Sequence, residues 1–574
     1  MADTPVPVHP ATPGARLRRH PVPSIALVLL GLFSWPLAAS SPKFFQAATQ
    51  AEFLKGELDS LSIDSRGQLT IGAASELVYE TAAPFLWSML AAPDGALWVG
   101  TGNEGKVFRV DSQGRGTVFF DSEELEAHAL APAPDGGLYV GTSPDGKVYK
   151  VDRRGTAATF FEPGEQYIWA MVSDARGQLY VATGPKGNVY KVAPDGKGTK
   201  FYTAQATNVT AIALAPAGDH VIIGTDAPGR VLRVDQQGKA FLLLDTPFEE
   251  VRSLRFDDKG MLYVAAVNGR TGSAPPPRAD SGATPAPATE SAAAPVPVVS
   301  VSTEITAVAV VDTGAGATTS TSPPDRRTLK GAVFRIASDG LWDKLWDSRD
   351  DLPYDVAFDA QGRLVVATGH QGKLYRLEGE QLQPTLIATA GGQQVTSLWR
   401  DRQGQLYYAT ANPGKVFRLS ANRAPRGTYE SDTRDAGMVS SWGSISWRAT
   451  MPAGSRLDVS TRSGNSETPN DTWSDWTAPY ANPTGSPIVS PKARYLQWRA
   501  VLSGTASPVL TSVTAAYLQR NLRPEVQSVT VHPPGIVFQK PYTTGDPELA
   551  GFENQTTPER ALTNAAMTSG AGAS

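Results

Sequence analysis

The chain has 574 residues, a formal net charge of −4 and no cysteine. This length allows two or three domains with their own cores. The balanced charge excludes a bulk electrostatic footprint for nucleic acid. The lack of cysteine excludes disulfides, thiolate metal sites, catalytic thiols and a lipid-modified N-terminal cysteine.

Residues 1–40 are predicted to be an export signal. Arginines precede the apolar run 25–33, and the small residues of 36–40 offer a cleavage site. The run is shorter than the roughly 20 residues that span a bilayer, so we expect no membrane span in the mature chain. The alternative is an N-terminal anchor that is never cut. An exported chain without cysteine suits a bacterial periplasm or the extracellular space.

A repeat follows. Seven times, a run such as LYVGT (138–142) is followed by a run such as GKVYKVD (146–152). A turn that ends in glycine precedes each pair, at Gly95, Gly136, Gly177, Gly218, Gly260, Gly362 and Gly404. A period near 40 made of short β runs predicts a propeller with one four-stranded blade per repeat. We therefore predict an all-β protein, with a seven-bladed β-propeller over 75–422.

The seventh repeat has runs for three strands and then loses the pattern at ANRAPRG (421–427). Residues 75–82 (SELVYETA) resemble the outer strands of the other repeats. They are predicted to supply the missing strand and close the ring, because this pairing removes two open edges. Residues 41–74 are left as an N-terminal lead-in.

Over residues 86–420 this alternation resembles the propeller repeats of the two-component-regulator type. It is also similar to streptogramin-lyase-like and other bacterial propellers. The resemblance implies a propeller that senses or binds a ligand. It transfers no catalytic residue to this chain.

A low-complexity insertion, 270–330, interrupts the fifth repeat and is predicted to stay disordered. Its β-rich run 298–312 is interpreted either as a loosely ordered flap or as a hairpin that contributes to a binding face.

Residues 427–520 alternate as strands and predict a β-sandwich of jelly-roll type. Its motif TWSDW (472–476) is a platform for a saccharide or part of the core. Residues 521–574 are interpreted as an incomplete β segment and a disordered tail.

One position differs between the repeats. Eight residues before each turn glycine stand Trp87, His128, Trp169, Thr210, Arg252, Tyr354 and Thr396. The next residue is small in six of the seven repeats, as expected beside a crowded axis. We expect this ring and His370 to surround one mouth of the channel. Trp87, Trp169, Arg252 and Tyr354 are predicted to bind a planar or sugar-like ligand, with His128 and His370 at the rim. The alternative is that the tryptophans only fill gaps between blades.

Two functional classes remain. The first is a non-enzymatic propeller that binds a small molecule, a glycan or a protein; no nucleic-acid partner is expected. The second is a propeller hydrolase or lyase, for which His128, His370, Asp355 and Glu165 are the candidate contributors. No HExxH, GxSxG or P-loop motif occurs, so no catalytic residue, metal site or cofactor is assigned.

Overall fold

The computed structural model describes residues 41–269, 329–390 and 392–519. The predicted signal 1–40, nearly all of the insertion 270–330 and the segment 521–574 lie outside these residues. The described chain is all-β, with one short helix. No helix among these residues has the length and apolar character needed to cross a bilayer.

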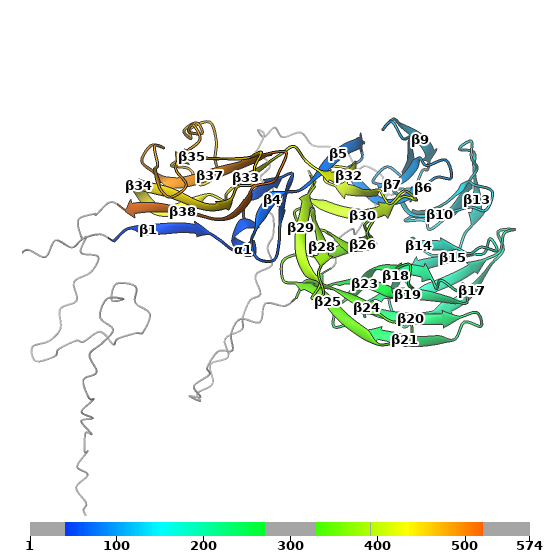
Figure 1. Ribbon diagram of the computed structural model, residues 1–574. Helices are drawn as coiled ribbons and strands as arrows, with labels where there is room; N and C mark the ends of the chain where they lie inside the picture. The colour runs from blue at the N-terminus through cyan, green and yellow to red at the C-terminus, as the bar shows by residue number, and fades with distance from the viewer. Residues whose placement is uncertain (1–40, 270–328, 391, 520–574) are drawn as a thin grey trace, which may run out of the picture. The chain divides into compact units, whose positions relative to one another are not determined.

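Within the described residues, the repeats form seven four-stranded antiparallel blades (Figure 1). The strands of the first four blades are β6 (Phe85–Ala91), β7 (Leu97–Gly102), β8 (Lys106–Val110), β9 (Gly116–Asp121); β10 (Glu126–Pro132), β11 (Leu138–Ser143), β12 (Val148–Val151), β13 (Ala157–Phe161); β14 (Tyr167–Ser173), β15 (Leu179–Gly184), β16 (Asn188–Val192), β17 (Gly198–Thr203); β18 (Asn208–Leu214), β19 (His220–Asp226), β20 (Arg230–Asp235), β21 (Ala240–Asp245). The strands of the last three are β22 (Glu250–Phe256), β23 (Leu262–Val267), β24 (Gly331–Ile336), β25 (Trp342–Ser348); β26 (Pro353–Phe358), β27 (Leu364–Thr368), β28 (Lys373–Glu378), β29 (Gln383–Thr389); β30 (Gln394–Arg400), β31 (Leu406–Ala411), β32 (Lys415–Arg423), β5 (Ala73–Glu80).

The seventh blade joins the two ends of the propeller sequence. β5 pairs antiparallel with β32, and Figure 1 shows this blue strand beside the yellow one. Two ion pairs, Arg418 with Glu76 and Lys415 with Glu80, cross the same strand pair. The strand begins and ends two residues earlier than the sequence pattern suggests. It pairs an edge of β32 that would otherwise be open.

The second β-rich region, which we call the accessory β region, comprises residues 43–71 and 426–519. Its elements are β1 (Lys43–Ala47), α1 (Gln50–Phe53), β2 (Glu57–Asp59), β3 (Leu61–Ile63), β4 (Leu69–Ile71), β33 (Arg426–Glu430), β34 (Arg434–Thr450), β35 (Ser455–Gly464), β36 (Ser486–Pro487), β37 (Ala493–Gly504) and β38 (Val509–Gln519). The long strand β37 pairs with β33 and β35, while β38 pairs with β1 and β34. The sandwich architecture of 427–520 stays a prediction.

The segment 41–74 is more than a lead-in. β1 pairs with β38 over five residues, and β2 pairs with β33. Phe53 of α1 is fully buried and packs edge-on against Tyr429 and Trp498. The segment therefore supplies strands and a core residue to a region that lies more than 350 residues later in the chain.

Candidate functional site

The first strand of every blade lines a cavity at the centre of the propeller. This cavity has a volume of about 240 Å³. Two positions of every first strand contribute to its wall. We call the first set the channel ring: Trp87, His128, Trp169, Thr210, Arg252, Tyr354 and Thr396. The following residues form the inner layer: Ser88, Ala129, Ala170, Ala211, Ser253, Asp355 and Ser397.

A β-bulge places each channel-ring residue. In blade one, Leu86 pairs with Thr101 and Ser88 with Gly100, so the pairing skips Trp87. The same register shift skips the channel-ring residue in each of the other six blades. A bulge leaves its extra residue unpaired and re-aims the side chain. The fold therefore turns seven side chains, of five residue types, toward one cavity.

Glycines make room for the three largest non-basic ring residues. A Cβ on Gly102, Gly184 or Gly369 would overlap the side chain of Trp87, Trp169 or Tyr354 respectively. The corresponding positions behind the other four ring residues hold Ser143, Asp226, Val267 and Ala411. The sequence carries this signal as LWVGTG, LYVATG and LVVATG, but the sequence reasoning did not use it.

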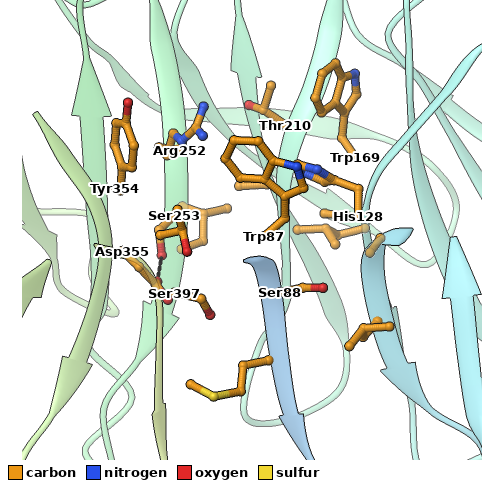
Figure 2. A pocket seen from close by; sticks show the side chains of 18 of the residues that line it. Trp87, Ser88, His128, Trp169, Thr210, Arg252, Ser253, Tyr354, Asp355 and Ser397 are labelled. Carbon is orange, nitrogen blue, oxygen red and sulfur yellow. Dashed lines mark hydrogen bonds between the residues drawn. The ribbon is translucent and has the colours of Figure 1, made fainter. Parts of the chain in front are cut away.

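Blades one to three contribute a continuous aromatic arc, formed by Phe85, Trp87, His128, Trp169 and Tyr167. Figure 2 labels the three of these that belong to the channel ring, Trp87, His128 and Trp169. Phe85 stacks on Trp87 with ring centroids 5.4 Å apart, and Tyr167 stacks on Trp169 at 5.3 Å. His128 bridges the two tryptophans at centroid distances of 5.8 and 5.3 Å. These contacts cross two blade boundaries, so the arc is also part of the packing between blades.

The indole N–H groups of the arc differ in their partners. Trp169 Nε1 donates to Asn208 Oδ1 at 3.0 Å, and Asn208 Nδ2 donates to Asp226 at 2.7 Å. Trp87 Nε1 is buried and has no hydrogen-bond partner among the described residues. The orientation of Trp169 is therefore fixed by a polar chain, whereas that of Trp87 depends on packing alone.

Blades five and six contribute the charged side of the mouth. The Arg252 guanidinium pairs with Glu250 at 3.1 Å and lies 4.5 Å from the centroid of the Tyr354 ring. A guanidinium over an aromatic face is a favourable cation–π arrangement. Tyr354 is only 3% exposed, and its hydroxyl makes no hydrogen bond within the described chain.

His128 is held in its neutral form. Burial, and then the charge of Arg252, lower the pKa of His128 to about 3. Glu126 approaches the imidazole at 4.0 Å, which is beyond hydrogen-bonding distance, and burial raises the pKa of that carboxyl group. At neutral pH the side chain of His128 is a weakly basic aromatic ring.

Asp355 is the carboxylate of the inner layer, and four donors occupy it. Ser253 Oγ donates at 2.6 Å, Arg255 Nη2 at 3.2 Å, and the backbone N–H groups of Val356 and Leu398 at 2.9 Å each. Figure 2 shows the Ser253 bond as a dashed line. A carboxylate has about four lone-pair sites, so Asp355 has none left for a substrate. It fastens blades five, six and seven together.

Two predicted residues do not line this cavity. His370 is exposed in the loop that follows β27. Glu165 is buried, where it accepts hydrogen bonds from Asn188 Nδ2 at 2.7 Å and from the Tyr190 hydroxyl at 3.1 Å. The structure thus brings Trp87, His128, Trp169, Arg252 and Tyr354 around one cavity and leaves His370 outside it. Among the residues that the structure describes, no group of three or more histidine or carboxylate side chains is placed to hold a metal ion.

The TWSDW motif does not form an open platform. Trp473 is 7% exposed and its indole N–H donates to Ser466 Oγ at 2.9 Å. Trp476 is partly buried, and the guanidinium groups of Arg462 and Arg499 lie 4.5 and 4.4 Å from its ring centroid. We call this arrangement the tryptophan–arginine stack. It favours the interpretation of these tryptophans as packing residues.

No protein-family model and no curated protein sequence matches the chain. Among solved structures, a streptogramin B lyase matches 65% of this chain and 99% of its own at 12% identity, with a TM-score of 0.43. The virginiamycin B lyase of Staphylococcus aureus covers 64% of this chain and 100% of its own at 10% identity, with a TM-score of 0.45. The extracellular domain of a hybrid two component system from B. thetaiotaomicron covers 65% of this chain and 44% of its own at 12% identity, with a TM-score of 0.42. These are the kinds of propeller that the repeats resemble in sequence, and the likeness concerns the fold alone.

Proposed function

We propose that the protein is a non-enzymatic binding propeller that holds a ring-shaped ligand in the channel mouth. The observation that carries this proposal is the channel ring itself. Seven equivalent bulges turn side chains of five kinds toward one cavity, whereas a purely structural ring would be expected to repeat. Three of its members are aromatic rings joined across blades, and Arg252 lies at the same level (Figure 2). Aromatic faces combined with a few placed polar groups are typical of small-molecule sites.

The hydrolase or lyase alternative finds less support. General acid–base catalysis needs a group whose pKa lies near the working pH. His128 is shifted far below that range, and all lone pairs of Asp355 are engaged. His370 and Glu165, the other two candidates, do not line the cavity.

We also propose that the chain acts outside the cytoplasm, after removal of residues 1–40. The basic and apolar pattern of this segment supports the proposal. A ligand that reaches the channel mouth would then come from the periplasm or the medium. Separating the cell fractions of a producing bacterium and sequencing the N-terminus of the mature protein tests this. Cytoplasmic protein with an intact N-terminus would contradict it.

The binding proposal is tested with ring variants. Thermal-shift screening of the full chain against monosaccharides, oligosaccharides and single-ring heteroaromatic compounds should yield ligands that stabilise the wild type. Trp169→Ala and Arg252→Ala should lose this stabilisation. Trp342→Ala is the matched control, because Trp342 is half exposed on an outer strand and does not line the cavity. Ligands that stabilise the ring variants as well as the control would place binding elsewhere.

A further inference from the structure

We infer that the ligand of the channel mouth is an uncharged pyranose ring, presented alone or as the end of a neutral glycan. This inference rests on the proposed function and specifies the class of ligand. It follows from the charge pairing of the cavity wall, from the unpartnered hydroxyl group of Ser88 in the inner layer, and from the angles between the aromatic rings.

The formal charges of the cavity wall cancel in pairs. Its charged residues are Glu250, Arg252, Arg255 and Asp355, and they form two ion pairs with distances of 3.1 and 3.2 Å. A carboxylate ligand near Arg252 meets Glu250 beside it, while a cationic ligand meets two guanidiniums. Burial in a partly enclosed site strengthens both repulsions relative to water. The wall therefore favours a ligand without net charge.

One hydroxyl group of the inner layer has no partner. Ser88 Oγ is buried, makes no hydrogen bond within the described residues and lies beside Gly100 of its own blade. By contrast, the threonines of the ring donate to backbone oxygens of the next blade, Thr210 to Val251 O at 2.7 Å and Thr396 to Leu86 O. A buried hydroxyl without a partner is costly, so Ser88 gains a hydrogen bond if its side chain turns toward a ligand hydroxyl, which can both donate and accept.

The aromatic arc is curved, which favours a sugar over a flat heterocycle. The plane of His128 is inclined 40° to Trp87 and 89° to Trp169. A flat ring gains most between parallel faces, whereas a pyranose carries C–H groups on both faces and around its edge. The volume of about 240 Å³ is below the ~300–1,000 Å³ that is usual for drug-sized ligands. One ring therefore fits, and the rest of a glycan would extend from the mouth.

The test uses matched pairs of neutral and acidic sugars. Isothermal titration of the full chain is carried out near neutral pH with the methyl β-glycosides of glucose and galactose and with those of the corresponding uronic acids. We expect a neutral glycoside to bind at least about tenfold more tightly than its acid counterpart. Trp169→Ala should abolish that binding.

A second variant examines the charge pairing directly. Glu250→Gln releases Arg252 from its ion pair, so the acid glycoside should gain about tenfold in affinity while the neutral one changes little. Glu249→Gln is the control, because this exposed neighbour does not line the cavity. The melting temperature of each variant verifies that it is folded.

The outcomes separate the inference from the proposed function. If the acid glycosides bind as tightly as the neutral ones and Trp169→Ala abolishes both, the neutral-ligand inference is wrong and the binding mouth stands. If no glycoside binds at about 10 mM while a heteroaromatic compound does so in a manner sensitive to Trp169, the saccharide class is wrong. If every binding compound binds the Trp169→Ala and Arg252→Ala variants as tightly as the wild type, the proposed function itself fails.

Discussion

Tryptophan and arginine side chains occur both in the channel mouth and in the tryptophan–arginine stack, but in different arrangements. In the stack, the guanidinium groups of Arg462 and Arg499 lie 4.5 and 4.4 Å from the ring centroid of Trp476, which is partly buried. In the mouth, Arg252 instead lies over Tyr354, while Trp87 and Trp169 border a cavity. The difference shows that tryptophan and arginine together do not identify a binding site. The site depends on whether the fold leaves space beside the ring.

In each region, the local structure around the tryptophan determines whether space is left beside its ring. Each mouth tryptophan is the extra residue of a bulge, with a glycine behind it. The two arginines of the stack come from the neighbouring strands β35 and β37, which are paired along ten residues and carry their side chains toward the same loop. The account therefore predicts that mouth variants affect binding and that stack variants affect stability.

The largest effect is expected from deleting residues 41–82, which damages both regions at once. The deletion removes β5 from blade seven and removes β1, β2 and Phe53 from the accessory β region. Soluble yield should collapse, or the melting temperature should fall by on the order of 10 °C or more. Differential scanning calorimetry measures this. A deletion protein that melts like the parent would show that these pairings contribute nothing.

Breaking the stack should be the next largest effect. Trp476→Ala removes a large partly buried ring and two cation–π contacts, so the free energy of unfolding should fall by about 2–3 kcal/mol. Denaturant unfolding measures the loss, and Trp342→Ala serves as an exposed control. A change below about 0.5 kcal/mol, which is typical of surface substitutions, would contradict a packing role.

Substituting a glycine that lies behind a channel-ring residue tests whether the position of that ring residue matters for binding. Gly184→Ala places a methyl group against Trp169 Nε1 and Asn208 Oδ1, so the indole must leave its position. We expect a stability loss of about 1–2 kcal/mol together with loss of ligand binding. Ser143→Ala, at the equivalent position of blade two, should change neither by much. If Gly184→Ala binds normally, the pose of Trp169 does not matter for the ligand.

The smallest effect concerns His128 and pH. Because the folded pKa is about 3 and the unfolded pKa is about 6.5, the unfolded chain binds a proton that the folded chain does not between these values. The stability linked to His128 is thus complete above about pH 6.5 and is lost as the pH falls. Arg252 and Glu126 face this imidazole and remain in the variant His128→Gln.

Between about pH 7.5 and pH 5, the wild type should lose about 1–2 kcal/mol more than His128→Gln. Parallel stability profiles for the two proteins, measured by urea unfolding at each pH, would mean that folding does not lower the pKa of His128.

Much of the fold could be predicted because each blade repeats one turn. The glycines from Gly95 to Gly404 give the number of blades and the phase of the first strands, and this phase locates the channel ring. The bulges were not predicted. Each one shifts the alternation within its strand, as in β6, where the buried residues Leu86 and Met89 stand three positions apart. In a seven-residue strand this single shift is hard to recognise from residue types alone. The pairing of β1 with β38 also escaped prediction. A five-residue strand outside any repeat contains no sequence pattern that indicates its pairing partner, and this partner lies more than 460 residues away.

Of the candidate site, five residues predicted from position alone line the cavity, whereas His370 does not. That prediction assumed that a loop on the correct face brings its side chain to the mouth. His370 is exposed in the loop after β27, and the cavity wall does not include it.

The central claim is that binding belongs to the mouth and stability to the stack. Titrating the tightest methyl glycoside of the panel into the wild type, Trp169→Ala and Trp476→Ala by isothermal calorimetry tests it most directly. The account predicts wild-type affinity in Trp476→Ala, in spite of its lower stability, and no measurable binding in Trp169→Ala. Binding that survives in Trp169→Ala and disappears in folded Trp476→Ala would contradict it and assign the ligand to the accessory β region.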